Sequence, residues 1–224
     1  FDSAVQRDSQ SIAAHSVRAA ALIELGRFTE AADAYAEVVR LSPKDATARY
    51  NYSVSLYRLA RFQDAAAQLR ETVSLAPDHA PALYNLASLA QREGRLREAR
   101  DSWERFTRLR PQVASAWFNL GVVYMDLDQP VEAVACFAAV AELTPDDADA
   151  QVNLGLAHAL AEDYENALAA MRRADALEPC DEMIMKYLAA LHDLVADSGG
   201  PAAGQHRRIA VMLQEQVENT WLAP

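Results

Sequence analysis

Four asparagines recur at one constant interval (i, i+34, i+68 and i+102) and offer a repeated hydrogen-bonding group. They are Asn51, Asn85, Asn119 and Asn153. A carboxamide both donates and accepts hydrogen bonds, so a row of them can bind the amide groups of an extended peptide without reading its sequence. Asn inside a helix costs about 0.5 kcal/mol relative to Ala, and we expect a function that offsets this cost. The alternative is that these side chains form hydrogen bonds within or between helices of the protein itself.

Aromatic and cationic residues accompany the asparagines. An aromatic side chain directly precedes three of them, at Tyr50, Tyr84 and Phe118. Arg58 and Arg92 follow the first two asparagines, and a guanidinium can pair with a carboxylate of a partner. We predict that these five residues join the asparagines in one partner-binding surface. The alternatives are packing between neighbouring first helices for the aromatic rings and simple solvation for the arginines.

Residue patterns typical of catalytic and metal sites are absent from the sequence. It contains no glycine-rich phosphate-binding loop and no Gly-x-Ser-x-Gly nucleophile motif. The histidines show no metal-ligand spacing, and His158 and His192, which are separated by the same interval as the asparagines, are expected to pack on adjacent helices. We therefore predict a protein without enzymatic activity, metal or cofactor.

Composition narrows the function classes further. The 224 residues are 51% hydrophobic and 24% charged, as in a folded protein, and no apolar run reaches the roughly 18–20 residues that cross a bilayer. A net charge of −11 argues against binding to nucleic-acid phosphates. Cys136 and Cys180, interpreted as unpaired thiols, fit a reducing compartment, so the cytoplasm is favoured and the periplasm stays an alternative.

Charge is distributed unevenly along the chain. Residues 46–113 contain 11 Arg against 7 Asp or Glu, whereas residues 114–193 contain 3 Arg or Lys against 15 Asp or Glu. This asymmetry predicts that a partner with complementary charges at its two ends would be oriented by the protein. The alternative is that the acidic residues are solvated at turns.

The secondary-structure elements that position these residues can be inferred from the prolines, which recur at the same interval as the asparagines. Five prolines follow one another from i to i+34, at Pro43, Pro77, Pro111, Pro145 and Pro179. An internal period of this size predicts a repeat architecture. We divide the chain into a second-helix remnant (1–11), five repeats (12–45, 46–79, 80–113, 114–147 and 148–181) and a divergent last helix pair with a capping helix (182–224). Because the chain starts partway through a repeat, we expect the natural polypeptide to extend upstream.

Each repeat is predicted to form two helices. In 114–147 the apolar residues recur every three or four positions in two runs, separated by the break at 128–130. Pro145 closes the second run, because proline lacks the N–H that a helix needs and clashes with the preceding turn. In two other repeats the break contains Gly26 or Gly94, which suits a left-handed helix end.

The repeat residues resemble a known family. Trp117-x-x-Leu120-Gly121-x-x-Tyr124, then Ala133-x-x-x-Phe137, then Pro145, is similar to the tetratricopeptide repeat pattern. The resemblance implies an all-α fold, a right-handed superhelical α-solenoid of stacked helix-turn-helix repeats, in which the first helix of each repeat lines the concave side.

The function expected from this resemblance is a non-catalytic protein-protein interaction scaffold. It would bind an extended segment of a protein or peptide partner in the concave groove. Two alternatives stay open: the substrate-recognition portion of a larger enzyme, such as a protein glycosyltransferase, and a structural subunit of a bacterial envelope, secretion or pilus assembly. The sequence does not identify the partner or the oligomeric state.

Overall fold

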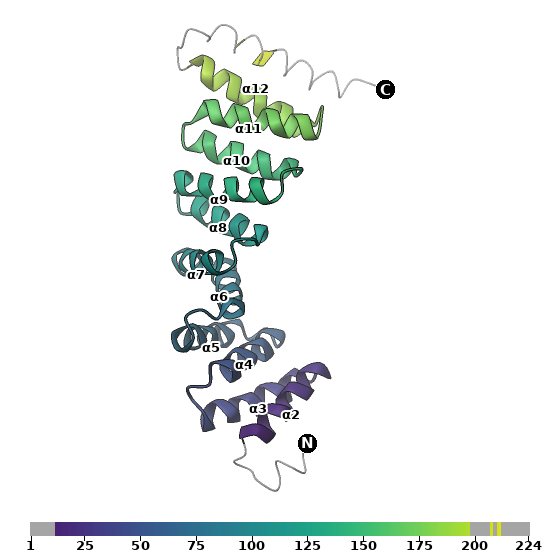
Figure 1. The fold of residues 1–224 in the computed structure, drawn as a ribbon, viewed down its shortest axis with the longest axis vertical. Helices are drawn as coiled ribbons and strands as arrows, with labels where there is room; N and C mark the ends of the chain where they lie inside the picture. Colours follow the sequence, from purple (N-terminus) through teal and green to yellow (C-terminus); the bar gives the residue numbers. More distant parts are fainter. Residues whose placement is uncertain (1–11, 198–206, 208–209, 212–224) are drawn as a thin grey trace. The chain divides into compact units, whose positions relative to one another are not determined.

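The computed structural model describes residues 12–197, 207, 210 and 211, and the secondary structure of these residues is helical throughout (Figure 1). This confirms the predicted all-α fold of stacked helix-turn-helix elements. The helices are α2 (Ile12–Glu24), α3 (Phe28–Leu41), α4 (Ala46–Arg58), α5 (Phe62–Leu75), α6 (Ala80–Arg92), α7 (Leu96–Leu109), α8 (Ala114–Asp126), α9 (Pro130–Leu143), α10 (Ala148–Leu160), α11 (Tyr164–Leu177) and α12 (Glu182–Asp197).

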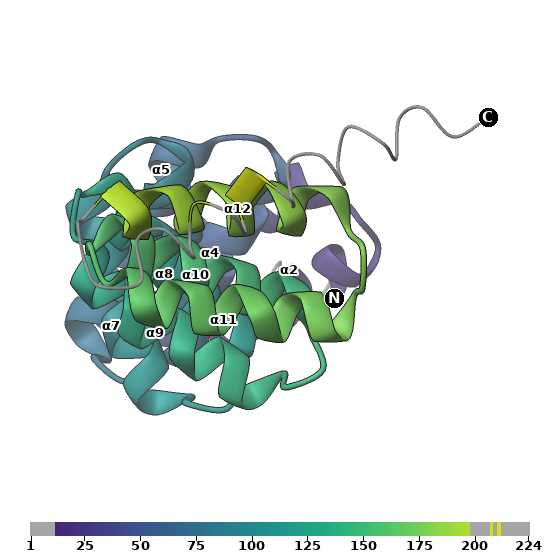
Figure 2. The same ribbon diagram turned by 90° about the horizontal axis from the view of Figure 1, so that it is seen from above.

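The chain divides into two compact units, residues 1–110 and 111–224. Unit 1 contains α2 to α7, and unit 2 contains α8 to α12. Within each unit every helix packs against the next one along the chain. The view in Figure 2 shows this for α11 and α12, which lie next to each other at the end of unit 2.

The core of unit 1 continues from one helical hairpin into the next. One cluster of buried residues joins the hairpin α4–α5 to α6, and its members are Leu56, Ala65, Ala66, Leu69, Ala82, Leu86 and Leu89. A smaller cluster connects α2 and α3 through Ala19, Ala34 and Tyr35, and Tyr52 of α4 packs against it. Each hairpin therefore buries its apolar face against a neighbouring hairpin, as expected for a repeat array.

The core of unit 2 follows the same plan. Residues of α9, α10 and α11 form one buried cluster, against which Trp117 and Tyr124 of α8 pack. A second cluster joins α11 to α12 through Leu168, Met171, Ile184 and Leu188. The helix α12 therefore takes the place of the next first helix in the stack.

The turn inside each hairpin contains one residue with a positive φ. Gly26 and Gly94 have φ of 69° and 71°, which confirms the predicted left-handed conformation. The same conformation occurs at Ala60, Asp128 and Glu162, with φ of 59°, 58° and 61°. These five positions follow the same interval as the prolines, so three hairpins keep the left-handed turn although a Cβ makes it costly.

The turn between hairpins depends on proline and on capping side chains. Each of the five periodic prolines comes two residues after a second helix has ended at a leucine. The next first helix begins with a side-chain cap at Asp45, His79 and Asp147, each accepting a hydrogen bond from a backbone N–H three residues later. Such caps satisfy N–H groups that the first helical turn leaves without a partner.

Two expected end segments fall on residues that the structure does not describe. The second-helix remnant expected at 1–11 lies outside the described residues. The expected capping helix at 205–221 lies mostly outside them, although Arg207, Ala210 and Val211 are described and helical.

Close helix contact in unit 2 requires glycine at one position in each hairpin. A Cβ placed on Gly121 of α8 would lie 2.8 Å from Cζ of Phe137 on α9, whose ring is buried. A Cβ on Gly155 of α10 would lie 3.0 Å from Cε of Met171 on α11. At these distances a side chain at either position would force the neighbouring residue to shift.

Replacing the left-handed residues tests the turn geometry. Ala60→Gly and Glu162→Gly should each raise the free energy of unfolding, by up to about 1 kcal/mol, because glycine removes the Cβ penalty of a positive φ. Gly26→Ala should lower it by about 1 kcal/mol for the same reason. Urea denaturation measures all three. Ala67→Gly, at an exposed helical position of α5, is the matched control and should destabilise. A loss of stability in Ala60→Gly as large as that in Ala67→Gly would contradict the left-handed assignment at Ala60.

The two tight glycines should respond differently to an added methyl group. Gly121→Ala should destabilise by about 1–3 kcal/mol, because the ring of Phe137 must move inside a packed core. Gly155→Ala should destabilise less than Gly121→Ala, because the flexible side chain of Met171 can shift in part and alanine favours the helix, although the carbonyl oxygen of Ala167 would lie 3.3 Å from the added Cβ. Thermal denaturation of both variants checks this. In the double variant Gly121→Ala/Phe137→Leu the penalty should be smaller than the sum of the two single penalties; additive penalties would show that the ring contact is not responsible.

Candidate functional site

The four asparagines all lie within first helices of hairpins and are partly exposed. Asn51 is on α4 and Asn85 on α6 in unit 1, while Asn119 is on α8 and Asn153 on α10 in unit 2. Their side chains fall into two groups. Asn51 shares a hydrogen bond with Tyr35 of α3, and Nδ2 of Asn153 donates to the carbonyl oxygen of Asp149 at 2.7 Å. The carboxamides of Asn85 and Asn119 have no hydrogen-bond partner among the described residues.

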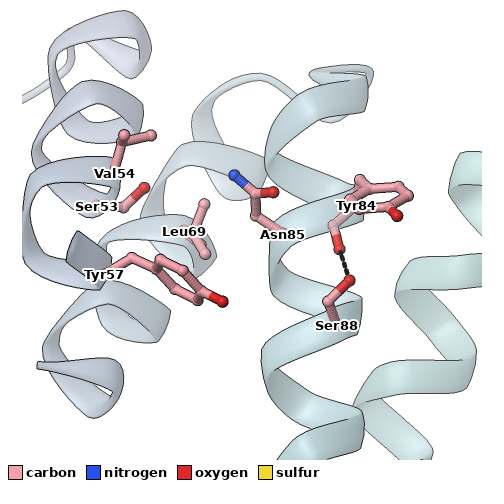
Figure 3. Close-up of a pocket in the computed structure, with 7 residues that line it drawn as sticks. All are labelled: Ser53, Val54, Tyr57, Leu69, Tyr84, Asn85 and Ser88. Carbon is pink, nitrogen blue, oxygen red and sulfur yellow. Dashed lines mark hydrogen bonds between the residues drawn. The ribbon is translucent and has the colours of Figure 1, made fainter. Parts of the chain in front are cut away.

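One of the two asparagines without a partner faces a hollow in unit 1. The hollow measures about 250 Å³ and is lined by Ser53, Val54, Tyr57, Leu69, Tyr84, Asn85 and Ser88. Six of these residues belong to α4 or α6, and Leu69 of α5 lies behind them. Figure 3 shows the carboxamide of Asn85 in the space between α4 and α6.

The walls of the hollow combine apolar surface with a few polar groups. Val54, Leu69 and the ring of Tyr57 supply the apolar part. The hydroxyl groups of Ser53 and Ser88 donate to carbonyl oxygens of their own helices, at 2.5 Å and 2.9 Å. Their donors are therefore used internally, and the carboxamide of Asn85 is the lining side chain with donor N–H groups left for a ligand.

The three predicted aromatic residues pack mainly against their own protein. Tyr84 makes edge contacts with Trp103 and Phe106 of α7, at centroid distances of 4.9 Å and 5.3 Å. Figure 3 accordingly shows the ring of Tyr84 turned away from the hollow. Phe118 makes a similar contact with Phe137 of α9, at 5.9 Å. These partners lie on the second helix of the same hairpin, whereas the alternative considered for the sequence was packing between neighbouring first helices.

Tyr50 differs from the other two aromatic residues. Its ring contacts the imidazole of His79 at 4.8 Å. His79 is also the residue that caps α6, through an Nδ1 that accepts from the N–H of Ala82 at 3.1 Å. Tyr50 thus packs on the start of the next hairpin.

The two predicted arginines lie over aromatic rings. Cζ of Arg92 is 3.6 Å from the ring centroid of Phe62 and 5.8 Å from that of Tyr57, and Cζ of Arg58 is 5.4 Å from the centroid of Phe28. This stacking was not predicted from the sequence. The available signal was the spacing, because Phe28 and Phe62 each begin a second helix and the arginine that covers each ring stands at the same offset, i+30, in the sequence.

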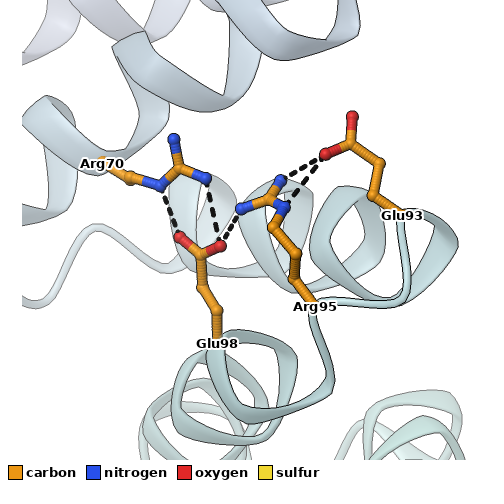
Figure 4. A network of polar contacts seen from close by, with 4 residues as sticks. All are labelled: Arg70, Glu93, Arg95 and Glu98. Atoms are coloured by element: carbon orange, nitrogen blue, oxygen red, sulfur yellow. Dashed lines mark hydrogen bonds and ion pairs between the residues drawn. The ribbon is translucent and has the colours of Figure 1, made fainter.

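Several other arginines of unit 1 are neutralised by ion pairs. Nε of Arg70 on α5 contacts Oε1 of Glu98 on α7 at 2.6 Å, and Glu98 also pairs with Arg95, which in turn pairs with Glu93 at 2.7 Å (Figure 4). The pair between Arg70 and Glu98 connects two successive second helices, and the two pairs of Arg95 lie at the turn between α6 and α7 and in the first turn of α7. Part of the excess of arginine in residues 46–113 therefore serves contacts within the fold.

The other polar candidates have structural partners or lie in the core. Nδ1 of His158 lies 3.1 Å from Oδ2 of Asp163, and His192 is buried on α12. Cys136 is buried on α9, and Cys180 is exposed after α11. No cluster of three or more potential metal ligands occurs among residues 12–197, 207, 210 and 211. In the same part of the chain no helix has the length and apolar character that a membrane span needs.

The family model described as Tetratricopeptide repeat matches residues 17–80, 84–135 and 123–179. The chain belongs to the tetratricopeptide repeat family. This confirms the resemblance identified from Trp117, Leu120, Gly121 and the periodic prolines.

Solved tetratricopeptide repeat structures share the fold. YrrB, described as a TPR protein with an unusual peptide-binding site, is 22% identical and has a TM-score of 0.70, with 83% of this chain and 95% of that chain covered. MamA is 22% identical with a TM-score of 0.64, covering 75% and 91% of the two chains. A MamA fragment from Desulfovibrio magneticus RS-1 is 24% identical with a TM-score of 0.56, covering 76% and 95%. The search of curated proteins found no match.

The contact between Tyr35 and Asn51 predicts a pH dependence of stability. Burial raises the pKa of Tyr35 above its ordinary value of 10.0, and the hydrogen bond with Asn51 opposes this shift only in part. Above pH 10 the unfolded chain therefore loses the phenolic proton while the folded protein retains it, so the free energy of unfolding falls as pH rises.

Urea denaturation of the wild type and of Tyr35→Phe between pH 8 and pH 11 measures this effect. The difference in unfolding free energy between wild type and variant should decrease above pH 10, and the variant cancels the contributions of the other titrating groups. Parallel curves for the two proteins would contradict a raised pKa at Tyr35.

Proposed function

We propose that this tetratricopeptide repeat protein is a non-catalytic interaction scaffold, and that unit 1 binds an extended segment of a partner protein across the hollow between α4 and α6. The supporting observation is the carboxamide of Asn85, which lies in an apolar hollow without a partner among the described residues. The carboxamide is partly exposed and its N–H and C=O groups are available for hydrogen bonds, so a peptide amide would supply their partner as the segment crosses the hollow.

The size of the hollow supports a peptide over a complete small molecule. Small-molecule pockets usually measure about 300–1,000 Å³, and this hollow is smaller, at about 250 Å³. We infer that it takes one apolar side chain of a longer segment. The peptide-binding site named in the description of YrrB is consistent with this use of the fold.

The remaining members of the predicted surface belong to the proposal as secondary contacts. Asn51, beside Tyr35, would add a second carboxamide on α4. Asn119, Asn153 and Phe118 would act as equivalent contacts within unit 2, and Tyr50 and Tyr84 would support the first helices from behind. We retain the division into repeats at 12–45, 46–79, 80–113, 114–147 and 148–181, with 1–11 and 182–224 as end segments, as part of this proposal.

Selection from a random peptide library tests the proposed function. The full chain is immobilised, enriched peptides are labelled with fluorescein, and their dissociation constants are measured by anisotropy. Ser88→Leu fills the hollow and should weaken binding at least tenfold, whereas Asn85→Ala removes one or two hydrogen bonds and should weaken it by about threefold to tenfold. Ala67→Leu, at an exposed position of α5 outside the proposed surface, is the matched control for added volume and should have no effect.

The asparagine ladder needs a separate comparison. If carboxamides of both units are used, two double variants should each weaken binding of the same peptides: Asn51→Ala/Asn85→Ala and Asn119→Ala/Asn153→Ala. An effect of the first pair alone would restrict the site to unit 1. Failure to enrich any peptide, or an unchanged affinity of Ser88→Leu, would refute binding in the hollow.

A further inference from the structure

Two first helices of unit 1 carry an asparagine and an arginine at equivalent positions of one stripe. On α4 the stripe is Asn51, Val54 and Arg58, and on α6 it is Asn85, Ser88 and Arg92. Residues three or four positions apart share one face of a helix. Val54, Asn85 and Ser88 line the hollow, so each arginine lies one helical turn beyond its rim, about 5.4 Å along the helix axis.

Aromatic rings that begin the preceding second helices hold both guanidinium groups. The closest stack is that of Arg92 on Phe62, with Tyr57 on a second side, and Arg58 lies over Phe28. Tyr57 connects the two features, because its ring lines the hollow and also contacts Phe62 at 5.4 Å. A guanidinium stacked by its face keeps its N–H donors at the edge, where they can bind a carboxylate with two parallel hydrogen bonds.

These guanidinium groups lack the anion that many arginines of unit 1 have. Arg58 and Arg92 are exposed, and neither forms an ion pair or a hydrogen bond with any residue that the structure describes. By contrast, six arginines of the same unit pair with carboxylates: Arg27, Arg40, Arg61, Arg70, Arg95 and Arg100. The two stacked arginines are therefore ordered cations whose donors stay available to a partner.

The fold itself does not require arginine at this place. The residues that occupy the place of Arg92 in the equivalent helices α8 and α10 are Asp126 and Leu160. An acid and an aliphatic side chain thus end equivalent helices in unit 2. The repeated arginine is confined to the two helices that border the hollow.

We propose that Arg58 and Arg92 form a carboxylate-binding edge of the hollow, so that the partner segment combines an apolar side chain in the hollow with Asp or Glu side chains against the arginines. This inference rests on the proposed function of the hollow and adds the chemical class of the segment. The two cations set which peptides are accepted, because a basic segment would be repelled where an acidic one is held.

A comparison of selected peptide sequences tests the acidic preference. The same random library is selected on the full-length wild type, on Arg58→Ala/Arg92→Ala, on Arg58→Glu/Arg92→Glu and on Arg97→Ala/Arg108→Ala. The last variant removes two exposed arginines from α7 and is the control for loss of net charge. Circular dichroism confirms that each variant is folded before selection.

The wild type and the control should enrich peptides with Asp or Glu near an apolar residue. The double alanine variant should keep the apolar preference and lose the acidic one, and the double glutamate variant should favour Lys or Arg. For a wild-type-selected peptide, the double alanine variant should raise the dissociation constant by about fivefold per arginine, the upper end for exposed ion pairs, and added salt should reduce the difference.

Two results would overturn the inference, and they are distinguishable from failure of the proposed function. Enriched peptides without acidic residues, or an acidic preference that persists in the double alanine variant, would refute the carboxylate-binding edge and leave the hollow as a peptide site. Absence of enrichment on the wild type would refute both.

Discussion

The structure depends on the burial of each hairpin's apolar face against the following hairpin. A single helix pair leaves that face exposed, and burial of apolar surface contributes about 25 cal/mol per Å². The clusters that join α4, α5 and α6 in unit 1, and α11 and α12 in unit 2, show how the burial is shared between successive hairpins. Close contact requires small residues at fixed places, and Ala65, Ala99, Ala133 and Ala167 are completely buried at one such place. The sequence has a constant period because this packing constraint recurs in every repeat.

The candidate site arises from what the packing constraint leaves free. The second helices and the rear of the first helices are committed to the core, as the contacts of Tyr84 with Trp103 and Phe106 illustrate. The exposed stripe of a first helix is free to vary. In α4 and α6 it carries an asparagine and an arginine, and in α8 and α10 the arginine is replaced. Variation on this stripe can therefore change the surface that the first helices present without changing the stack.

Much of this organisation could be predicted from the sequence, and the missed features have physical reasons. The prolines and the glycines at 26 and 94 predicted helix ends, because their backbone preferences are local. The left-handed residues Ala60 and Glu162 carry no such local preference, and the turn there is imposed by the packing of the two helices. The stacking of Arg92 on Phe62 depends on contacts between neighbouring hairpins. The constant sequence offset between ring and arginine can be interpreted as a contact only when the positions of the hairpins are known. Likewise, sequence patterns identified four equivalent asparagines, but their different hydrogen bonds depend on what each neighbouring helix presents, such as Tyr35 beside Asn51.

The order in which the helices pack also bears on how the protein folds. Within each unit the helices contact their neighbours along the chain, so most contacts join residues that are close in sequence. Chains with such local contacts fold rapidly, because little loop-closure entropy is lost before contacts form. In repeat arrays, nucleation can begin at any hairpin and spread to the next. A hairpin that forms during synthesis can accordingly serve as the template for its successor, and the array can grow as fast as the chain is made.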